Sequence, residues 1–139
     1  DINYVLVGKE DDLFKGHKLH TLKNVFFLGE KQQTQVPAYI AHFDICINPQ
    51  KINEITIGNY PRKIDEYLAL GKPVIATRTK TMSIFDLHVW NCTNTDEYIA
   101  AIREALQTNN PEKIQQRIKF AHTHTWKNSV DKMYSYINL

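Results

Sequence analysis

Cysteine is scarce in this sequence of 139 residues, which contains only Cys46 and Cys92. Two cysteines in a chain of this length do not make a disulfide framework, so a disulfide-stapled miniprotein is excluded. No basic residue adjoins either thiol, which argues against a nucleophilic role for them. We therefore expect a reducing, cytoplasmic setting.

Glycine and proline are also few, at five each, and neither sign of charge predominates, with 17 basic and 15 acidic residues. This composition excludes a collagen-like chain and a disordered tail. A net charge of +2 gives no electrostatic reason to expect nucleic acid or an anionic membrane as partner. We expect one globular domain with its own core.

Long hydrophobic runs are missing too, because no apolar stretch approaches the roughly 20 residues of a membrane-spanning helix. No signal peptide is recognisable. The sequence begins at Asp1 and runs directly into a strand-like segment, so we expect it to be part of a longer protein. Any peripheral association with the inner face of a membrane would then depend on sequence outside it.

Short, nearly all-apolar runs alternate with segments of helical period, as in a parallel sheet whose strands are buried on both faces. The pattern predicts an α/β fold, a Rossmann-like parallel sheet flanked by helices. The expected strands are residues 4–8, 25–29, 45–48, 74–77 and 88–92. The expected helices are residues 35–43, 59–71, 95–107, 110–121 and a last one from 125, whose aromatic residues we expect to cover a core.

The helix over residues 59–71 has the clearest end signals. Asn59 is a candidate N-cap, Pro61 suits a first turn, and Gly71 suits the left-handed residue that ends a helix. A long loop over residues 49–59 precedes it, at the carboxyl edge of the predicted sheet, where open α/β sheets bind ligands.

This helix start predicts an anion site. Gly58 allows close approach of backbone to a ligand, amides from Asn59 onward face out of the helix, and Arg62 and Lys63 add charge. Glu66 follows one turn later and is suited to accept hydrogen bonds from two ribose hydroxyls. The alternative for Glu66 is a surface pair with Arg62 or Lys63.

The segment from Tyr60 to Thr77 resembles the signature Ser-Pro-x-Lys-x-x-Glu-Tyr-Leu-Ala-x-Gly-Lys-Pro-Val-Val-Ala-Thr of group 1 (family 4-like) glycosyltransferases. Asn24 to Gly29 is similar to the Asn-Val-x-Phe-Leu-Gly strand of the family, and Tyr39 to Pro49 to its Tyr-x-x-x-x-Asp-x-x-x-x-Pro segment. The three segments occur in the order and spacing of the family. The resemblance is to the C-terminal, donor-binding domain of the two-domain GT-B fold.

The resemblance implies that residues 1–139 are a nucleotide-sugar donor domain of a hexosyltransferase-type enzyme in polysaccharide biosynthesis. The position of Glu66 implies ribose binding, and Lys63 and Arg62 become the catalytic cations that stabilise the departing diphosphate. Further substrate contacts are implied for backbone and side chains elsewhere in the site: Gly58, Asn59, Tyr60, Glu30, Lys31 and Gly8.

Gly58 departs from the family pattern, since many members have there a glutamate that touches the donor sugar. Glu54 or the loop over residues 50–57 is the candidate replacement. The resemblance also places a first strand, a basic segment and an N-terminal acceptor domain before Asp1, so we expect this chain alone to be inactive. The partners expected are the nucleotide sugar and that acceptor domain.

No metal or other cofactor is expected. His17 and His20, and likewise His122 and His124, lie close in sequence but lack a third ligand at suitable spacing. Two alternative functions stay open: a nucleotide-sugar epimerase of the same fold and a flavodoxin-like interaction module. A phospho-acceptor receiver is disfavoured because no aspartate ends residues 45–48.

Overall fold

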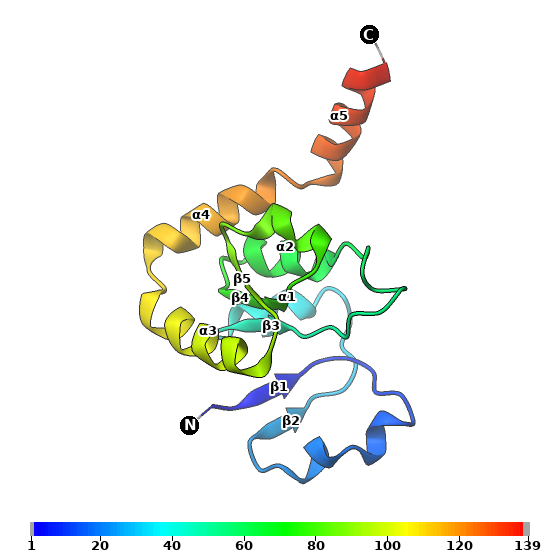
Figure 1. The fold of residues 1–139 in the computed structure, drawn as a ribbon, viewed down its shortest axis with the longest axis vertical. Helices are drawn as coiled ribbons and strands as arrows, with labels where there is room; N and C mark the ends of the chain where they lie inside the picture. The colour runs from blue at the N-terminus through cyan, green and yellow to red at the C-terminus, as the bar shows by residue number, and fades with distance from the viewer. Residues whose placement is uncertain (1, 138–139) are drawn as a thin grey trace. The chain divides into compact units, whose positions relative to one another are not determined.

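The computed structural model describes residues 2–137, which fall into two compact units, one up to Tyr39 and one from Ile40 onward. Figure 1 shows the elements of both units along the chain. The expectation of one donor-binding domain over residues 1–139 stays a prediction.

The first unit contains two parallel strands, β1 (Tyr4–Leu6) and β2 (Val25–Phe27), with Tyr4 opposite Val25. Two short 3-10 helices, η1 (Phe14–Gly16) and η2 (Lys18–Thr21), lie on the connection between them. The His20 ring stacks on Phe27 with the ring centroids 3.9 Å apart. Aromatic packing therefore holds this connection against β2.

The second unit contains a three-stranded parallel sheet in the order β3 (Cys46–Asn48), β4 (Val74–Thr77), β5 (Val89–Cys92). The central strand β4 is covered on both faces, because Val74, Ile75 and Ala76 are all fully buried. Consecutive strand residues face opposite sides of a sheet, so both sides must be covered. The nearly all-apolar sequence of β4 predicted this.

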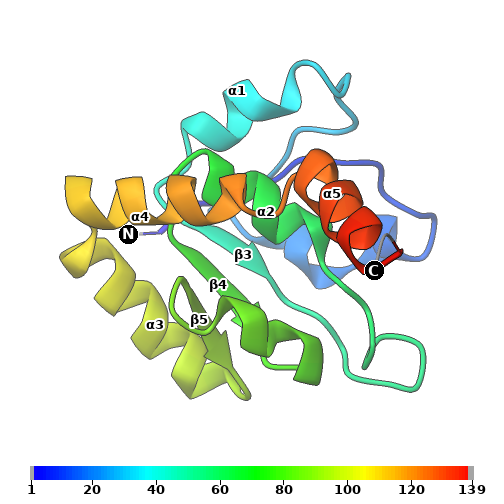
Figure 2. The same cartoon turned by 90° about the horizontal axis from the view of Figure 1, so that it is seen from above.

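Helices cover both faces of this sheet. Ile75 and Cys92 pack against Ala101 of α3 (Thr95–Thr108). On the other face lies α2 (Arg62–Ala69), whose Ile64 and Leu68 are fully buried. Figure 2 shows α4 (Pro111–His122) lying alongside α2, against which it packs. The prediction of parallel α/β sheets flanked by helices is confirmed.

Several helix ends agree with their sequence signals. The side chains of Asn94 and Asn110 accept hydrogen bonds from the amides of Glu97 and Lys113 and so cap α3 and α4. Gly71 follows α2 with a φ of 70°, the left-handed conformation expected of it. These ends are set by local chemistry, which explains why they were predictable.

Other boundaries differ from prediction. The strands β1 and β2 end two residues earlier than expected, and α1 (Val36–Ala41) is shorter than residues 35–43. The 3-10 helix η3 (Lys80–Phe85) was not predicted. The last helix, α5 (Trp126–Ile137), has no buried residue among those described, so the expectation that its aromatics cover a core was wrong for this chain. Within residues 2–137 no helix has the length and apolar character needed to span a bilayer.

Candidate active site

The loop between β3 and α2 has neither helical nor strand structure, as predicted, but hydrogen bonds fix its course. The Asn53 side chain accepts bonds from the amides of Ile55 (3.0 Å) and Thr56 (2.9 Å). The Gln50 amide donates to the hydroxyl of Thr77 (2.9 Å), at the end of β4. The loop is therefore attached to the carboxyl edge of the sheet, where ligands bind in open α/β folds.

The helix after this loop begins at Arg62, with Pro61 at the N-cap position and no side-chain cap. The prediction that Asn59 caps the helix, with Pro61 in its first turn, was wrong. The Asn59 amide donates to the Thr56 carbonyl (3.1 Å), and the Asn59 carbonyl accepts from the Thr81 hydroxyl (2.9 Å). Asn59 thus belongs to the turn that ends the loop, three residues before the helix.

Two amides at this helix start stay open. Among the hydrogen bonds of residues 2–137, none uses the amide of Tyr60 or Lys63 as donor. The Arg62 amide, in contrast, donates to the Tyr60 carbonyl (3.0 Å). Amides and macrodipole at the start of a helix attract an anion, and here α2 is eight residues long.

Lys63 and Glu66 are both exposed on α2. Lys63 and Glu66 take part in none of the ion pairs or side-chain hydrogen bonds found in the described part of the chain. The alternative that Glu66 merely pairs with Arg62 or Lys63 is therefore not found. A cation and a carboxylate one turn apart stay available to a ligand.

Arg62 is engaged differently, because its guanidinium carbon lies 4.8 Å from the ring centroid of Trp126, over the ring. The Tyr60 hydroxyl donates to the Asp65 carboxylate (2.6 Å), and burial, followed by this bond, raises the pKa of Tyr60. The hydroxyl therefore stays protonated and committed to Asp65. Sequence reasoning singled out Tyr60 and Arg62 but missed both of their partners.

Gly58 has an ordinary φ, and a Cβ built on it would meet nothing within 4 Å. Neither the local backbone nor its neighbours therefore require glycine there. Glu54, the candidate replacement for the family glutamate, is exposed in the same loop.

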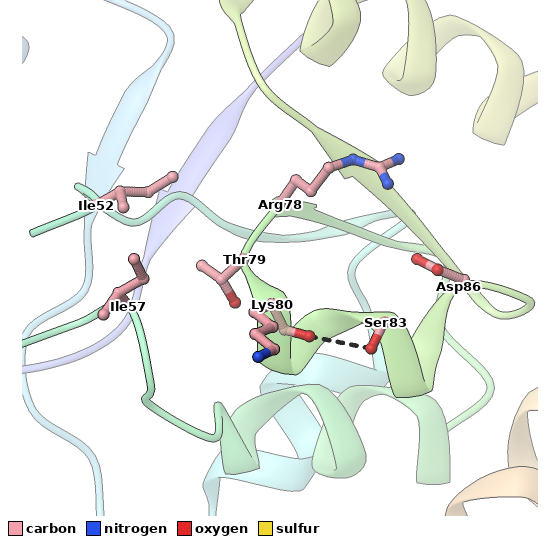
Figure 3. A pocket seen from close by; sticks show the side chains of 7 residues that line it. All are labelled: Ile52, Ile57, Arg78, Thr79, Lys80, Ser83 and Asp86. Carbon is pink, nitrogen blue, oxygen red and sulfur yellow. Dashed lines mark hydrogen bonds between the residues drawn. The ribbon is translucent and has the colours of Figure 1, made fainter.

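A cavity of about 480 Å³ lies beside this loop. Ile52 and Ile57 of the loop line one side of it and Thr79 faces them, as Figure 3 shows. Arg78 and Lys80, at the carboxyl end of β4, add two cations to its lining. The volume is typical of small-molecule sites. Sequence reasoning missed these two cations, although their place directly after a buried strand was a usable signal.

Gly8, Glu30 and Lys31 lie in the first unit, at the ends of β1 and β2. The Gly8 amide donates to the Gly29 carbonyl (3.1 Å), which brings Gly8 beside the turn that precedes Glu30. The Lys31 ammonium contacts the Leu28 carbonyl and lies 5.8 Å from the Tyr39 ring centroid. These contacts place the three residues at one edge of their own sheet.

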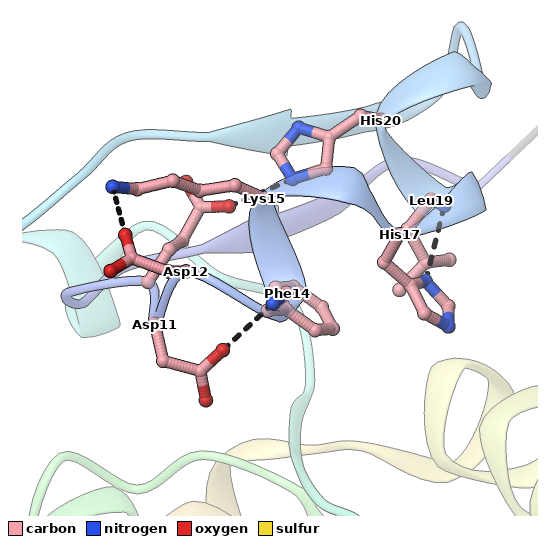
Figure 4. Close-up of polar contacts among 8 residues, drawn as sticks. Asp11, Asp12, Phe14, Lys15, His17, Leu19 and His20 are labelled. Atoms are coloured by element: carbon pink, nitrogen blue, oxygen red, sulfur yellow. Dashed lines mark hydrogen bonds and ion pairs between the residues drawn. The ribbon is translucent and has the colours of Figure 1, made fainter.

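Three of the four histidines flagged by spacing have side-chain contacts in the described part of the chain. Figure 4 shows the η1–η2 segment, in which His17 accepts a hydrogen bond from the Leu19 amide (3.3 Å). His20 pairs with Glu10 (2.8 Å), and His124 with Asp65 (3.1 Å). Within residues 2–137 no three histidine, cysteine, aspartate or glutamate side chains gather as metal ligands.

Both cysteines are free and buried. Burial raises the pKa of Cys46 to about 12, against the smaller opposing effect of Lys72. Burial also raises the pKa of Cys92. Neither thiol is activated toward nucleophilic attack, since the thiolate is the reactive form.

Comparison with known proteins shows the family of the chain. The chain is 32% identical over 114 residues to the "Putative teichuronic acid biosynthesis glycosyltransferase TuaH" of Bacillus subtilis (strain 168). That match covers 78% of this chain and 29% of the relative, so the chain spans under a third of the relative's length. A sequence model described as "Glycosyl transferases group 1" matches residues 1–108, which include both parallel sheets, the loop and helix α2. The chain belongs to the group 1 glycosyltransferases.

Proposed function

We propose that this chain binds a nucleotide diphosphate sugar as the donor-binding part of a glycosyltransferase. The observation that carries the proposal is on α2, where Lys63 and Glu66 are exposed without partners next to two open amides. A cation with open amides suits a diphosphate, and a carboxylate suits ribose hydroxyls. The family membership makes this ligand the natural choice over the epimerase or the interaction module.

The proposed chemistry is stabilisation of a leaving group. When the bond between the anomeric carbon and the diphosphate breaks, negative charge grows on the diphosphate oxygens. Lys63, Arg62 and the amides of Tyr60 and Lys63 would stabilise that charge. No residue set of the described chain calls for a metal, and we propose metal-independent binding and transfer.

Other parts of the proposal concern the remaining residues. Glu30, Lys31 and Gly8 would contact the nucleobase side of the donor. Asn59 and Gly58 would offer backbone at the helix start, while the cavity lined by Ile52, Ile57 and Arg78 offers room for the sugar. The hexose donor, an acceptor domain on the same protein, a role in polysaccharide biosynthesis and a cytoplasmic location belong to the same proposal.

The first test is a thermal-shift panel with ADP, GDP and UDP, with and without a chelator. Binding to the folded state raises the apparent melting temperature. We expect at least one nucleoside diphosphate to stabilise the chain equally in both conditions. If none of the three did so at millimolar concentration, the assignment as a donor-binding chain would be wrong.

Calorimetric titration of variants with the best nucleotide then tests the two residues. Glu66→Gln should weaken both nucleoside and nucleoside diphosphate by about 1 to 3 kcal/mol. Lys63→Ala should weaken the diphosphate far more than the nucleoside, and added salt should reduce that difference. Lys119→Ala, which removes an exposed cation from α4, is the matched control. Unchanged affinity in both site variants would remove them from the site.

A further inference from the structure

The junction between α4 and α5, residues Thr123–Trp126, lies against the first turns of α2. His124 Nδ1 is 3.1 Å from Asp65 Oδ1, and the guanidinium of Arg62 lies over the Trp126 ring. The two contacts thus join two nearby residues of the junction, His124 and Trp126, to two residues within one turn of α2. A segment about 60 residues later in the chain therefore fixes the helix start to which the proposed function assigns the diphosphate.

The junction is itself held firmly. The His124 ring packs edge-on against Phe120, with centroids 4.5 Å apart, and against the fully buried Phe85. At the start of α5, the Asn128 amide donates to the Thr125 hydroxyl (3.2 Å) and its side chain to the His122 carbonyl (2.9 Å). The backbone turn that carries Trp126 is therefore fixed by hydrogen bonds, although Trp126 itself is 68% exposed.

An arginine side chain uses different parts of its guanidinium group for aromatic contacts and for hydrogen bonds. A guanidinium stacks on an aromatic ring with its face, whereas its five N–H donors point outward in its plane. Trp126 contacts Arg62 through a cation–π interaction, with the guanidinium carbon 4.8 Å from the ring centroid. Among the hydrogen bonds and ion pairs of the described residues, none involves the Arg62 side chain. The ring therefore restricts the guanidinium and leaves its donors available.

We propose that Trp126 is a positioning residue that pre-orders Arg62 for binding the diphosphate of the donor, and that His124 holds Trp126 in place by anchoring the junction on Asp65. The start of α5 is thereby part of the donor site without touching the donor. The inference rests on the proposed function, because it assumes that Arg62 binds phosphate. Stacking lowers the ordering cost that a free arginine side chain meets on binding.

The test is a double-mutant cycle read by calorimetry, with the best-binding nucleotide of the ADP, GDP and UDP panel as probe. Trp126→Ala should weaken the nucleoside diphosphate about two- to fivefold, the range for an exposed cation–π contact, and should leave the bare nucleoside unaffected. Trp126→Phe should retain most of the affinity. In an Arg62→Ala background, Trp126→Ala should have no further effect.

Tyr134→Ala removes another exposed aromatic side chain from α5 and should leave affinity unchanged. A second readout uses fluorescence, since Trp90 and Trp126 are the only tryptophans. In a Trp90→Phe background, Arg62→Ala should change the Trp126 emission, because it removes the guanidinium from the indole face.

The outcomes separate this inference from the proposed function. If Arg62→Ala weakens the diphosphate but Trp126→Ala does not, Trp126 does not position Arg62 and the donor site still stands. Equal losses from Trp126→Ala with and without Arg62 would also overturn the inference, since Trp126 would then act through another route. If substitutions of Arg62, Lys63 and Glu66 all leave the nucleotide affinity unchanged, the proposed function itself is wrong.

Discussion

At the scale of single residues, Glu97 shows how a charged side chain fixes a helix start. Its carboxylate accepts hydrogen bonds from the Thr93 amide (2.6 Å) and the Thr93 hydroxyl (2.9 Å), and from the Asn94 side chain (3.1 Å). These bonds, the one from the Thr93 amide first, hold the pKa of Glu97 below its ordinary value of 4.5. The bonds favour the ionised carboxylate, so they link the stability of the α3 start to pH.

Glu97→Gln should therefore change how stability responds to acid. A depressed folded-state pKa stabilises the fold above the unfolded pKa and loses this effect as pH falls through the folded one. We expect the wild type to melt at a higher temperature than the variant at neutral pH and the difference to shrink below about pH 4. Circular dichroism melts across pH measure it. Glu104→Gln, on the exposed side of α3, is the control; a pH-independent difference for Glu97→Gln would refute the linkage.

Position 71 requires glycine for two reasons, its backbone conformation and the close packing around it. Its φ is 70°, and a Cβ built on it would lie 2.6 Å from Ile114 Cγ2 in α4. Gly71→Ala should lower the free energy of unfolding by about 1 to 2 kcal/mol from the left-handed conformation alone, and by more from the clash. Gly58→Ala, with ordinary φ and open space, should change it by less than about 0.5 kcal/mol. Chemical denaturation compares the two, and equal effects would contradict this account.

At the scale of whole elements, one side chain joins α4 to the end of α2. Arg117 is 3% exposed; its Nε donates to the Gly71 carbonyl (2.9 Å), and its Nη2 contacts the Asn109 side chain. Burial lowers the pKa of Arg117, which has no carboxylate partner among the ion pairs of residues 2–137. The positive charge is placed at the carbonyl end of α2, where the helix dipole favours it.

Removing this contact should loosen the packing of α4 on α2. Arg117→Ala should lower the free energy of unfolding by about 2 to 4 kcal/mol, since it opens a cavity and leaves the Gly71 carbonyl without its partner. Arg117→Met should cost less, because it keeps most of the apolar stem. Urea unfolding gives both values, and Arg103→Ala on the exposed side of α3 is the control. A loss no larger than that of the control would show that the contact contributes nothing.

The same elements show what a sequence can and cannot predict. Strand β4 was predicted residue for residue, because Pro73 cannot continue a helix and the run that follows it is nearly all-apolar. The start of α2 was misplaced, because the bond that occupies the Asn59 carbonyl comes from Thr81, 22 residues later. The 3-10 helices were missed, since such short turns carry no repeating apolar pattern.

The candidate site likewise has features that the sequence predicts and features that it does not. The positions of Lys63 and Glu66 followed from local pattern and from the family signature, both of which lie within one helix. The contacts of Asp65 and Arg62 with the α4–α5 junction did not, because no sequence period relates residues 59 to 64 positions apart. Such long-range contacts depend on how the helices pack.

At the scale of the whole molecule, the proposal divides binding from catalysis. In the second unit, the donor contacts proposed for this chain lie in the loop after β3, at the end of β4 and on α2. We propose that a separate domain binds the acceptor, and the chain spans 29% of the length of its TuaH relative. Binding of the donor alone does not orient the acceptor against it. That orientation lowers the barrier of a transfer reaction.

We therefore expect the 139-residue chain to bind a nucleoside diphosphate yet transfer no sugar to any acceptor. Orienting a donor and an acceptor against each other can contribute about 7 to 11 kcal/mol of a barrier, and that contribution needs both binding surfaces. The measurement is product formation from UDP-, GDP- and ADP-glucose with carbohydrate and lipid-phosphate acceptors, with calorimetry of the same preparation to establish that nucleotide binds. Release of nucleoside diphosphate without an acceptor reports slow hydrolysis and is measured as the background. Robust transfer above that background by a preparation free of other proteins would show that this chain carries the acceptor groups as well, and the division into a donor part and an absent acceptor part would be wrong.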